Sequence, residues 1–192
     1  MTSLLEAQLE AQNLLQLGPL FLHSKTTGAA ELAEVVEIAI LDSSGKPLVD
    51  ELVKPKRHIR PNATEEHGVT DEMVDFAPRW AEILPKVEEL LLGKKVCVYD
   101  PASELLAIRN SYHNIHQRWV LDETNFYSLM DLYSRYKNER DPHTGMLLTY
   151  SLEDAARLVG IDIEIIAFRR AHEDAWLMRA ILLAIAGWKV YY

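Results

Sequence analysis

Cysteine is almost absent from this chain, which contains a single copy, Cys97, in 192 residues. One thiol cannot form a disulfide within the chain, and it cannot build a metal site that needs several cysteines. The scarcity of cysteine therefore predicts a reducing compartment. Stability has to come from a hydrophobic core, and 48% hydrophobic residues in a chain of this length are enough for one ordinary domain.

Positive charge and long hydrophobic runs are also scarce. Lys and Arg total 20 against 29 Asp and Glu, a formal net charge of -9, so any contact with nucleic acid needs a local basic patch. The most apolar stretch, residues 175–188, is interrupted by Arg179 and is too short to span a bilayer. Residues 1–12 contain no Lys or Arg, unlike a secretory signal. We therefore expect a soluble, cytoplasmic protein with no membrane partner.

The order of the predicted strands and helices indicates an α/β fold. Leucines at helical spacing, followed by Gly18-Pro19, predict an N-terminal amphipathic helix over residues 1–18, ahead of a domain at 19–192. Alternating and β-branched patterns predict strands at 20–22, 35–41, 48–53 and 95–99, the first three of them antiparallel. Helices are expected at 77–92 (with a kink or a break at Pro85), 103–115, 126–133, 151–160 and 171–186. This order predicts a mixed sheet covered by helices.

Several segments, taken together, resemble a known family. The segment Phe21–Gly28 is similar to the opening motif of the DEDDh 3′-5′ exonucleases, the superfamily of the polymerase III proofreading subunit and RNase T. Residues 96–106 and 169–174 resemble its second and third motifs, and His67–Met73 fits the family pattern between them. The resemblance covers residues 19–186. It implies an RNase H-like fold, here a five-stranded mixed sheet with three antiparallel strands first, flanked by helices.

The resemblance also implies a chemistry, which this sequence does not match. The family hydrolyses phosphodiesters with two Mg²⁺ ions, four carboxylate ligands and a histidine general base. Here the first two acidic positions carry His23 and Lys25, and the next carries Glu104. The general-base position carries Arg169, and only the last acidic position keeps its residue, Asp174.

The sum of charges at these positions decides whether they could hold two metal ions. Glu104 and Asp174 contribute two negative charges, Lys25 and Arg169 contribute two positive charges, and with His23 taken as neutral the sum is zero. A fixed ammonium about 4 Å from Mg²⁺ repels it by roughly 8 kcal/mol at an effective dielectric constant near 20. The sequence therefore predicts no metal, no resident cofactor and no catalysis by the family mechanism.

Lys25 offers a substitute for the missing metal charge. Carboxylates that share a cleft need counter-charge, so we predict that Lys25, and by the same argument Arg169, pairs with Asp174 or Glu104. An alternative is a site for one transition metal on His23, Glu104 and Asp174. Lys25 opposes that alternative, because it lies two residues after His23 and hence on the same face of a strand.

Other residues are candidates for contact with nucleic acid. Thr26, Thr27 and His67 correspond to positions that the resemblance places near a terminal nucleotide, although a structural role in the cleft wall also suits His67. The run Lys54–Arg60 carries four cationic residues that could contact phosphates. It contains no aromatic residue for base stacking, which favours a solvated loop.

The sequence leaves three functions open. The first is an exonuclease-fold domain that has lost catalysis and acts as a protein-interaction or regulatory scaffold, as a homodimer or with another protein. The second is binding of single-stranded nucleic acid without cleavage, through Thr26, Thr27 and His67. The third is an active 3′-5′ exonuclease with an altered site for Mg²⁺ or Mn²⁺.

Overall fold

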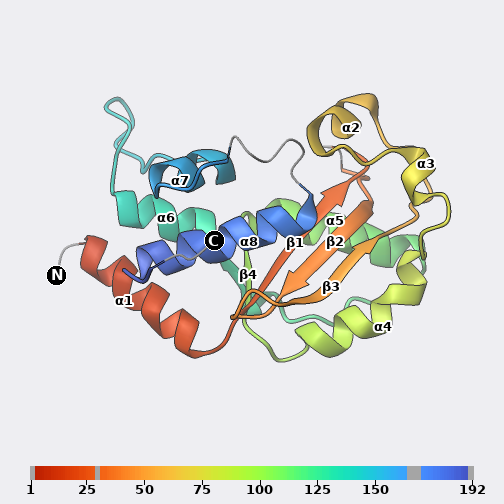
Figure 1. Ribbon diagram of the computed structural model, residues 1–192, viewed down its shortest axis with the longest axis horizontal. Coiled ribbons are helices and arrows are strands. Elements are labelled where there is room, and N and C mark those ends of the chain that lie inside the picture. Colours follow the sequence, from red (N-terminus) through yellow and green to blue (C-terminus); the bar gives the residue numbers. More distant parts are fainter. Residues whose placement is uncertain (1–2, 29–30, 164–169, 190–192) are drawn as a thin grey trace.

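A five-stranded sheet organises the molecule in the computed structural model, which describes residues 3–28, 31–163 and 170–189 (Figure 1). The strands are β1 (Leu20–Thr26), β2 (Val35–Leu41), β3 (Pro47–Leu52), β4 (Val96–Val98) and β5 (Phe126–Ser128). The helices are α1 (Ser3–Gln16), α2 (Pro61–His67), α3 (Asp71–Val74), α4 (Trp80–Leu91), α5 (Pro101–Asn114), α6 (Leu129–Lys137), α7 (Leu152–Leu158) and α8 (Ala171–Ile185). A short 3₁₀ helix, η1 (Glu123–Asn125), precedes β5.

The sheet has the strand order β3-β2-β1-β4-β5. β1 pairs with β2 and β2 with β3 in antiparallel fashion, whereas β4 is parallel to β1 and β5 is parallel to β4. The three antiparallel strands therefore come first in the chain and two parallel strands follow. This arrangement confirms the predicted five-stranded mixed sheet with three antiparallel strands first.

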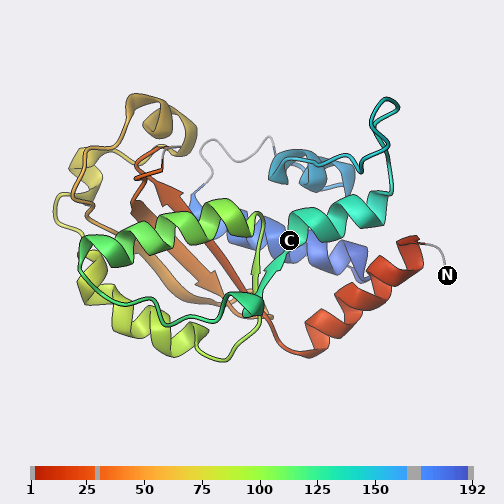
Figure 2. The same cartoon turned by 180° about the vertical axis from the view of Figure 1, so that it is seen from behind.

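Helices cover both faces of the sheet, and β1 lies at its centre. Figure 1 shows α8 crossing one face with α1 and α6 beside it, and Figure 2, from behind, shows α4 and α5 on the other. Phe21 of β1 packs in the α8 core, whereas Leu22 packs in the core formed with α4 and α5. Because side chains alternate along a strand, His23 and Lys25 follow Phe21 toward α8 and Ser24 points toward α5. The site residues therefore lie toward the C-terminal end of β1, after its hydrophobic residues.

The first helix packs against α6 and α8. Its buried face consists of Ala7, Ala11, Leu14 and Leu15. At the edge of this contact, Glu10 accepts hydrogen bonds from Arg135 and from the Tyr127 hydroxyl. Hydrophobic burial, the Glu10–Arg135 ion pair and hydrogen bonds, including one from Gln12 to the Ala186 carbonyl, therefore hold α1 to the rest of the chain.

The observed elements differ from the predicted ones in several places. Phe126 belongs to the three-residue strand β5, so the helix predicted from it begins only at Leu129. The chain from Trp80 to Leu91 is a single helix through Pro85, not two. Proline removes one backbone hydrogen bond there, and the carbonyl it frees, that of Ala81, belongs to an exposed residue that water can reach. Asp100, not Ser103, caps α5, because its carboxylate accepts a hydrogen bond from the Ala102 N–H.

The structure bears on two further predictions, the absence of a membrane-spanning helix and the role of Cys97. Within residues 3–28, 31–163 and 170–189, no helix has both the length and the hydrophobicity that crossing a bilayer requires. The cytoplasmic location stays a prediction. Cys97 is fully buried in β4, and burial raises the pKa of its thiol well above the ordinary value, so this cysteine is a core residue and not a nucleophile.

Candidate functional site

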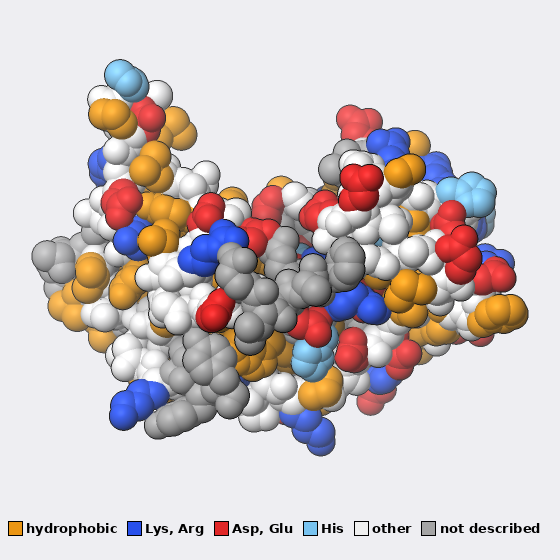
Figure 3. Space-filling view, turned by 45° about the horizontal axis from the view of Figure 1, so that its top comes forward, with side chains coloured by type: hydrophobic (Ala, Val, Ile, Leu, Met, Phe, Trp, Pro, Cys, Tyr) orange, Lys and Arg blue, Asp and Glu red, His pale blue; other side chains and the backbone are white. Residues whose placement is uncertain are grey.

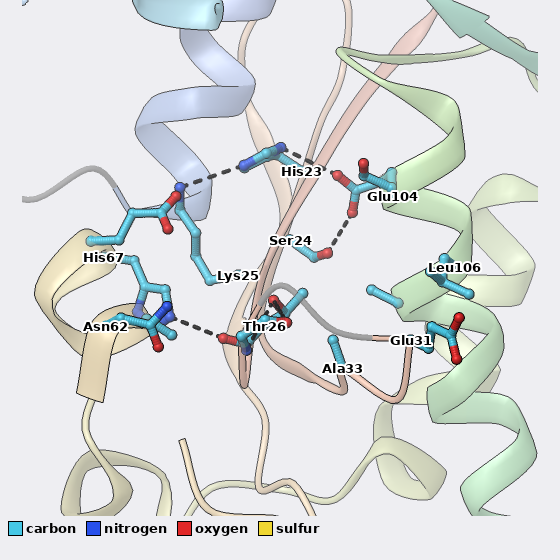
Figure 4. A pocket seen from close by; sticks show the side chains of 15 residues that line it. His23, Ser24, Lys25, Thr26, Glu31, Ala33, Asn62, His67, Glu104 and Leu106 are labelled. Carbon is cyan, nitrogen blue, oxygen red and sulfur yellow. Dashed lines mark hydrogen bonds and ion pairs between the residues drawn. The ribbon is translucent and has the colours of Figure 1, made fainter. Parts of the chain in front are cut away.

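Four charged side chains meet where β1 passes between α5 and α8. His23 and Lys25 come from β1, and Glu104 comes from the first turn of α5 (Figure 4). Asp174 comes from the first turn of α8. Lys25, Glu104 and Asp174 are all less than 8% exposed. The structure therefore brings together four of the five site residues expected from the sequence. The fifth, Arg169, lies outside the described residues.

His23 bridges the two carboxylates. Its Nδ1 lies 3.2 Å from Glu104 Oε2, and its Nε2 lies 3.3 Å from Asp174 Oδ2. Burial lowers the pKa of this imidazole, but the Asp174 and Glu104 carboxylates outweigh burial and raise the pKa to about 9. His23 is therefore a cation at pH 7. Treating it as neutral in the sequence-based charge sum was wrong, because that state depends on two carboxylates from distant parts of the chain.

Lys25 lies against the same carboxylate as His23. Its Nζ is 2.5 Å from Asp174 Oδ2 and 3.5 Å from His23 Nε2. Burial by itself would raise the pKa of Asp174, but His23 and Lys25 hold it well below its usual range. The predicted pairing of Lys25 with Asp174 is confirmed. The four described side chains, two cations and two anions, sum to zero.

Ser24 is a site residue that the sequence reasoning missed. Its hydroxyl donates a 2.5 Å hydrogen bond to Glu104 Oε1, and so it occupies the carboxylate oxygen that His23 leaves free (Figure 4). The strand alternation of β1, which sends Ser24 toward α5, was the available signal.

Glu37 of β2 is a second missed residue. It is 2% exposed and lies directly opposite Lys25 in the β1–β2 register. Its Oε1 lies 2.5 Å from Arg170 Nη2, and its Oε2 accepts a 3.0 Å hydrogen bond from the Ala171 N–H. Glu37 therefore anchors the N-terminal end of α8, three residues before Asp174. A lone glutamate within an otherwise apolar strand was the signal for it.

His67 is held in one neutral form. Its Nδ1 accepts a hydrogen bond from the Val69 N–H, so its Nε2 carries the proton and donates to the Thr26 carbonyl at 3.0 Å. Burial lowers the pKa of this imidazole, because the protonated ring would lose its hydration inside the protein. His67 thus ties α2 to the end of β1, and both ring nitrogens are engaged.

A cavity of about 450 Å³ opens beside these residues. His23, Lys25 and His67 line one side of it, and Glu104 and Leu106 of α5 line the other (Figure 4). Ala107 of α5 also lines the cavity. Thr26 also lines it, with its hydroxyl directed to the Gly28 backbone, whereas Thr27 is buried and accepts a hydrogen bond from the Glu34 N–H. The cavity therefore combines polar groups near β1 with two apolar side chains of α5, Leu106 and Ala107, which lie beside Glu104.

These residues do not fit a pair of divalent cations. The Lys25 ammonium already occupies Asp174 Oδ2, where a metal ion would bind. The alternative of one metal on His23, Glu104 and Asp174 fails on geometry, because the two carboxylates contact opposite nitrogens of the ring and do not converge on one point. In the part of the chain that the structure describes, no group of three His, Cys, Asp or Glu side chains could hold an ion.

Comparison with known proteins places the chain in a family. Residues 22–164 match the exonuclease family model RNase_T. The chain is also 33% identical over 172 residues to "Uncharacterized exonuclease CP81" of Escherichia phage 186, and the match covers 87% of each protein.

The chain belongs to the RNase T exonuclease family. Solved structures of exonucleases share its fold at lower identity. One is Exonuclease X in complex with 5′ overhanging duplex DNA, at 21% identity and a TM-score of 0.60, covering 88% of this chain and 93% of that one. Another is the nuclease domain of 3′hExo, a DEDDh family member bound to rAMP, at 13% identity and a TM-score of 0.64, covering 84% and 88%. Family membership agrees with the resemblance seen in the motifs. It does not decide which chemistry the site performs, because that depends on the residues at the site.

Proposed function

We propose that this member of the exonuclease family has lost two-metal phosphodiester hydrolysis, and that its cleft binds the end of a single nucleic-acid strand without cutting it. The observation that carries the first part is the contact between Lys25 Nζ and Asp174 Oδ2. A divalent ion would have to displace a buried ammonium from a carboxylate while the His23 cation lies 3.3 Å from the same oxygen. The site is already neutral, so it offers an incoming ion no net attraction.

The binding part is supported by the cavity beside the site. Its volume of about 450 Å³ lies within the range of pockets that hold small molecules, and Leu106 and Ala107 of α5 offer an apolar surface that suits the face of a base. Lys25 and the Thr26 hydroxyl lie on the opposite side. Two of the similar solved structures are described as complexes with DNA, which supports nucleic acid as the ligand class.

Hydrolysis is tested with 5′-labelled single-stranded DNA and RNA oligonucleotides in Mg²⁺ and, separately, in Mn²⁺. We expect no shortening of either by the wild-type protein. Shortening that disappears in the Glu104→Gln and Asp174→Asn variants would overturn the proposal and establish the active altered-site alternative. Shortening that persists in both variants would come from a contaminating nuclease.

A reversion experiment separates loss of ligands from wider change. The triple variant His23→Asp, Lys25→Glu, Arg169→His restores the family's residue types at three positions. We expect it to bind Mn²⁺ in a calorimetric titration while the wild type does not, because it exchanges three positive charges for two negative ones. Manganese binding by the wild type would contradict the proposal directly.

A second candidate function, a protein-interaction scaffold, is favoured by the outer face of α1. Leu4, Leu5 and Leu9 are each more than 40% exposed on this helix. An apolar stripe on a surface helix is a common site of contact between proteins. Sedimentation of the wild type and of a Leu5→Gln/Leu9→Gln variant tests for a homodimer. A wild type that is monomeric at all concentrations would exclude the homodimer.

A further inference from the structure

A second cavity, of about 580 Å³, lies next to the first. One side of it is formed by residues that connect β1 and β2, among them Thr27 and Leu32, and the other side by Arg57, His58 and Arg60. Gly28, Glu31 and Ala33 line both cavities, so the two are adjacent parts of one cleft. We call this second cavity the cationic pocket.

The loop that carries the cations is held firmly by its backbone. The Lys54 N–H donates to the Pro78 carbonyl, and the Arg60 N–H donates to the Thr27 carbonyl. Between them, the Lys56 N–H donates to Glu34 Oε2 and the Ile59 N–H donates to Asp71 Oδ1. The Ile59 side chain is buried, whereas Lys56, Arg57, His58 and Arg60 are exposed. These hydrogen bonds order the loop when the protein folds. Binding a ligand to the loop therefore does not cost the conformational entropy of ordering it.

Two guanidinium groups are the cations at this pocket. Arg57 donates to the Leu32 carbonyl at 2.8 Å, and its Nε lies 3.9 Å from the buried Glu34. Arg60 makes no side-chain hydrogen bond or ion pair within the described residues, and its methylene groups pack against Gly28. Both side chains retain N–H groups for an anion, and guanidinium matches the geometry of phosphate.

The remaining charges near the pocket are largely engaged. The Lys56 ammonium donates to the Asn114 carbonyl, and His58 Nδ1 lies 2.9 Å from Asp71 Oδ2. Glu31 is the exposed carboxylate in the lining. Figure 3 shows basic, acidic and His side chains mixed over one face of the molecule. Among the residues that line the cationic pocket, the two arginines are the groups that can attract an anion.

We propose that Arg57 and Arg60 bind backbone phosphates of the nucleotides next to the strand end held in the first cavity. This inference rests on the binding part of the proposed function and adds to it a path for the strand. Gly28 lines both cavities, so a strand that leaves the first cavity past Gly28 enters the cavity lined by the two guanidinium groups. Binding by this route needs no metal ion.

The test measures fluorescence anisotropy of labelled oligothymidylates of one, two, four and eight nucleotides, in EDTA. For the wild type we expect affinity to increase from one nucleotide to four. In the Arg57→Ser/Arg60→Ser variant this increase should disappear, with a loss of about tenfold for the longer strands. The slope of log K against log salt should fall by about 1.4, since each single-strand phosphate contact contributes roughly 0.7.

The matched control is Arg118→Ser, which removes an exposed arginine that is not among the residues lining either cavity. It should leave the length dependence unchanged. An equal loss in Arg118→Ser, or a double variant that is folded by circular dichroism and binds like the wild type, would overturn the inference. Binding of the mononucleotide without any gain for longer strands would overturn it while leaving the proposed function intact. Cleavage in Mg²⁺ would instead count against the proposed function alone.

Discussion

Lys25 and Asp174 are 149 residues apart in the chain, yet the ammonium of one lies 2.5 Å from the carboxylate of the other inside the molecule. The pair joins the central strand β1 to the N-terminal end of α8. In a metal-dependent member of the family, carboxylates at such positions would share a divalent ion. Here a side chain of the protein supplies the positive charge, so the same ion pair that stabilises the fold is the basis for the proposed loss of hydrolysis.

Removing the ammonium should destabilise the protein. We expect Lys25→Met to reduce the free energy of unfolding by roughly 3 kcal/mol, because it leaves a buried carboxylate with one cation instead of two. Urea denaturation measures the change. The control Lys94→Met alters an exposed lysine and should change stability by less than about 0.5 kcal/mol. Equal effects of the two substitutions would show that the ion pair contributes nothing.

The charge of His23 predicts a loss of stability in alkaline solution. The pKa of His23 is about 9 in the folded protein and near 6.5 in the unfolded chain, so its contribution is complete below pH 6.5 and disappears as pH rises through 9. The wild type should therefore lose more stability than His23→Gln between pH 6.5 and 9.5, by at most about 3 kcal/mol. Urea titrations of both proteins across this range provide the measurement, and parallel curves would refute the raised pKa.

His67 should show the opposite dependence on pH. Its pKa is lowered by burial, so the unfolded chain binds a proton first as pH falls below about 6.5, and the folded state loses stability there. The wild type should lose stability relative to His67→Asn between pH 7 and 5. The chain has seven histidines, so the imidazole signals of these two are identified by their absence from the His23→Gln and His67→Asn variants. In an NMR titration the His23 signal should titrate near 9 and the His67 signal below 6.5. If both identified signals titrate near 6.5, both environments are contradicted.

Gly28 should not tolerate a side chain. Its φ is +143°, and a Cβ there would lie 2.8 Å from Arg60 Cδ. We expect Gly28→Ala to cost about 1–3 kcal/mol of stability and to weaken oligonucleotide binding by displacing Arg60. Gly93→Ala is the matched control, because φ is also positive there (+70°) but no atom lies within 4 Å of the added Cβ. The control should lose stability and keep binding, so a similar loss of binding in both would count against the role of Arg60.

Glu37 should be necessary for the position of α8. Glu37→Gln keeps the shape of the side chain but removes the charge that faces Arg170, so we expect a loss of about 2 kcal/mol. Hydrogen exchange of the first turn of α8 should increase at the same time. Asp50→Asn removes an exposed carboxylate that contacts His172 of the same helix, and it should leave the exchange unchanged. Unchanged exchange in Glu37→Gln would show that other contacts position the helix.

Patterns over many residues predicted the fold well, whereas features set by one residue or by distant partners escaped prediction. The hydrophobic and β-branched content of the segments and the turn between the strands were enough for α8 and for the β2–β3 hairpin, because each of these elements extends over several residues. β5 has three residues, too few for a period, and Phe126 also suits the spacing of the helix that follows it. The charge rule predicted that Lys25 would pair with a carboxylate. It could not predict the protonation of His23, which depends on carboxylates from two helices that only the folded chain brings together.

The register of β1 also affects how this lineage can change. Position 25 now depends on position 174, since each side chain neutralises the other inside the protein. A return of Lys25 alone to Glu would set a third acid beside Glu104 and Asp174, with the imidazolium of His23 as the remaining cation among these four side chains. If the proposed loss of hydrolysis holds, a route that restores Glu at position 25 first therefore passes through a less stable intermediate, and the ion pair opposes that step.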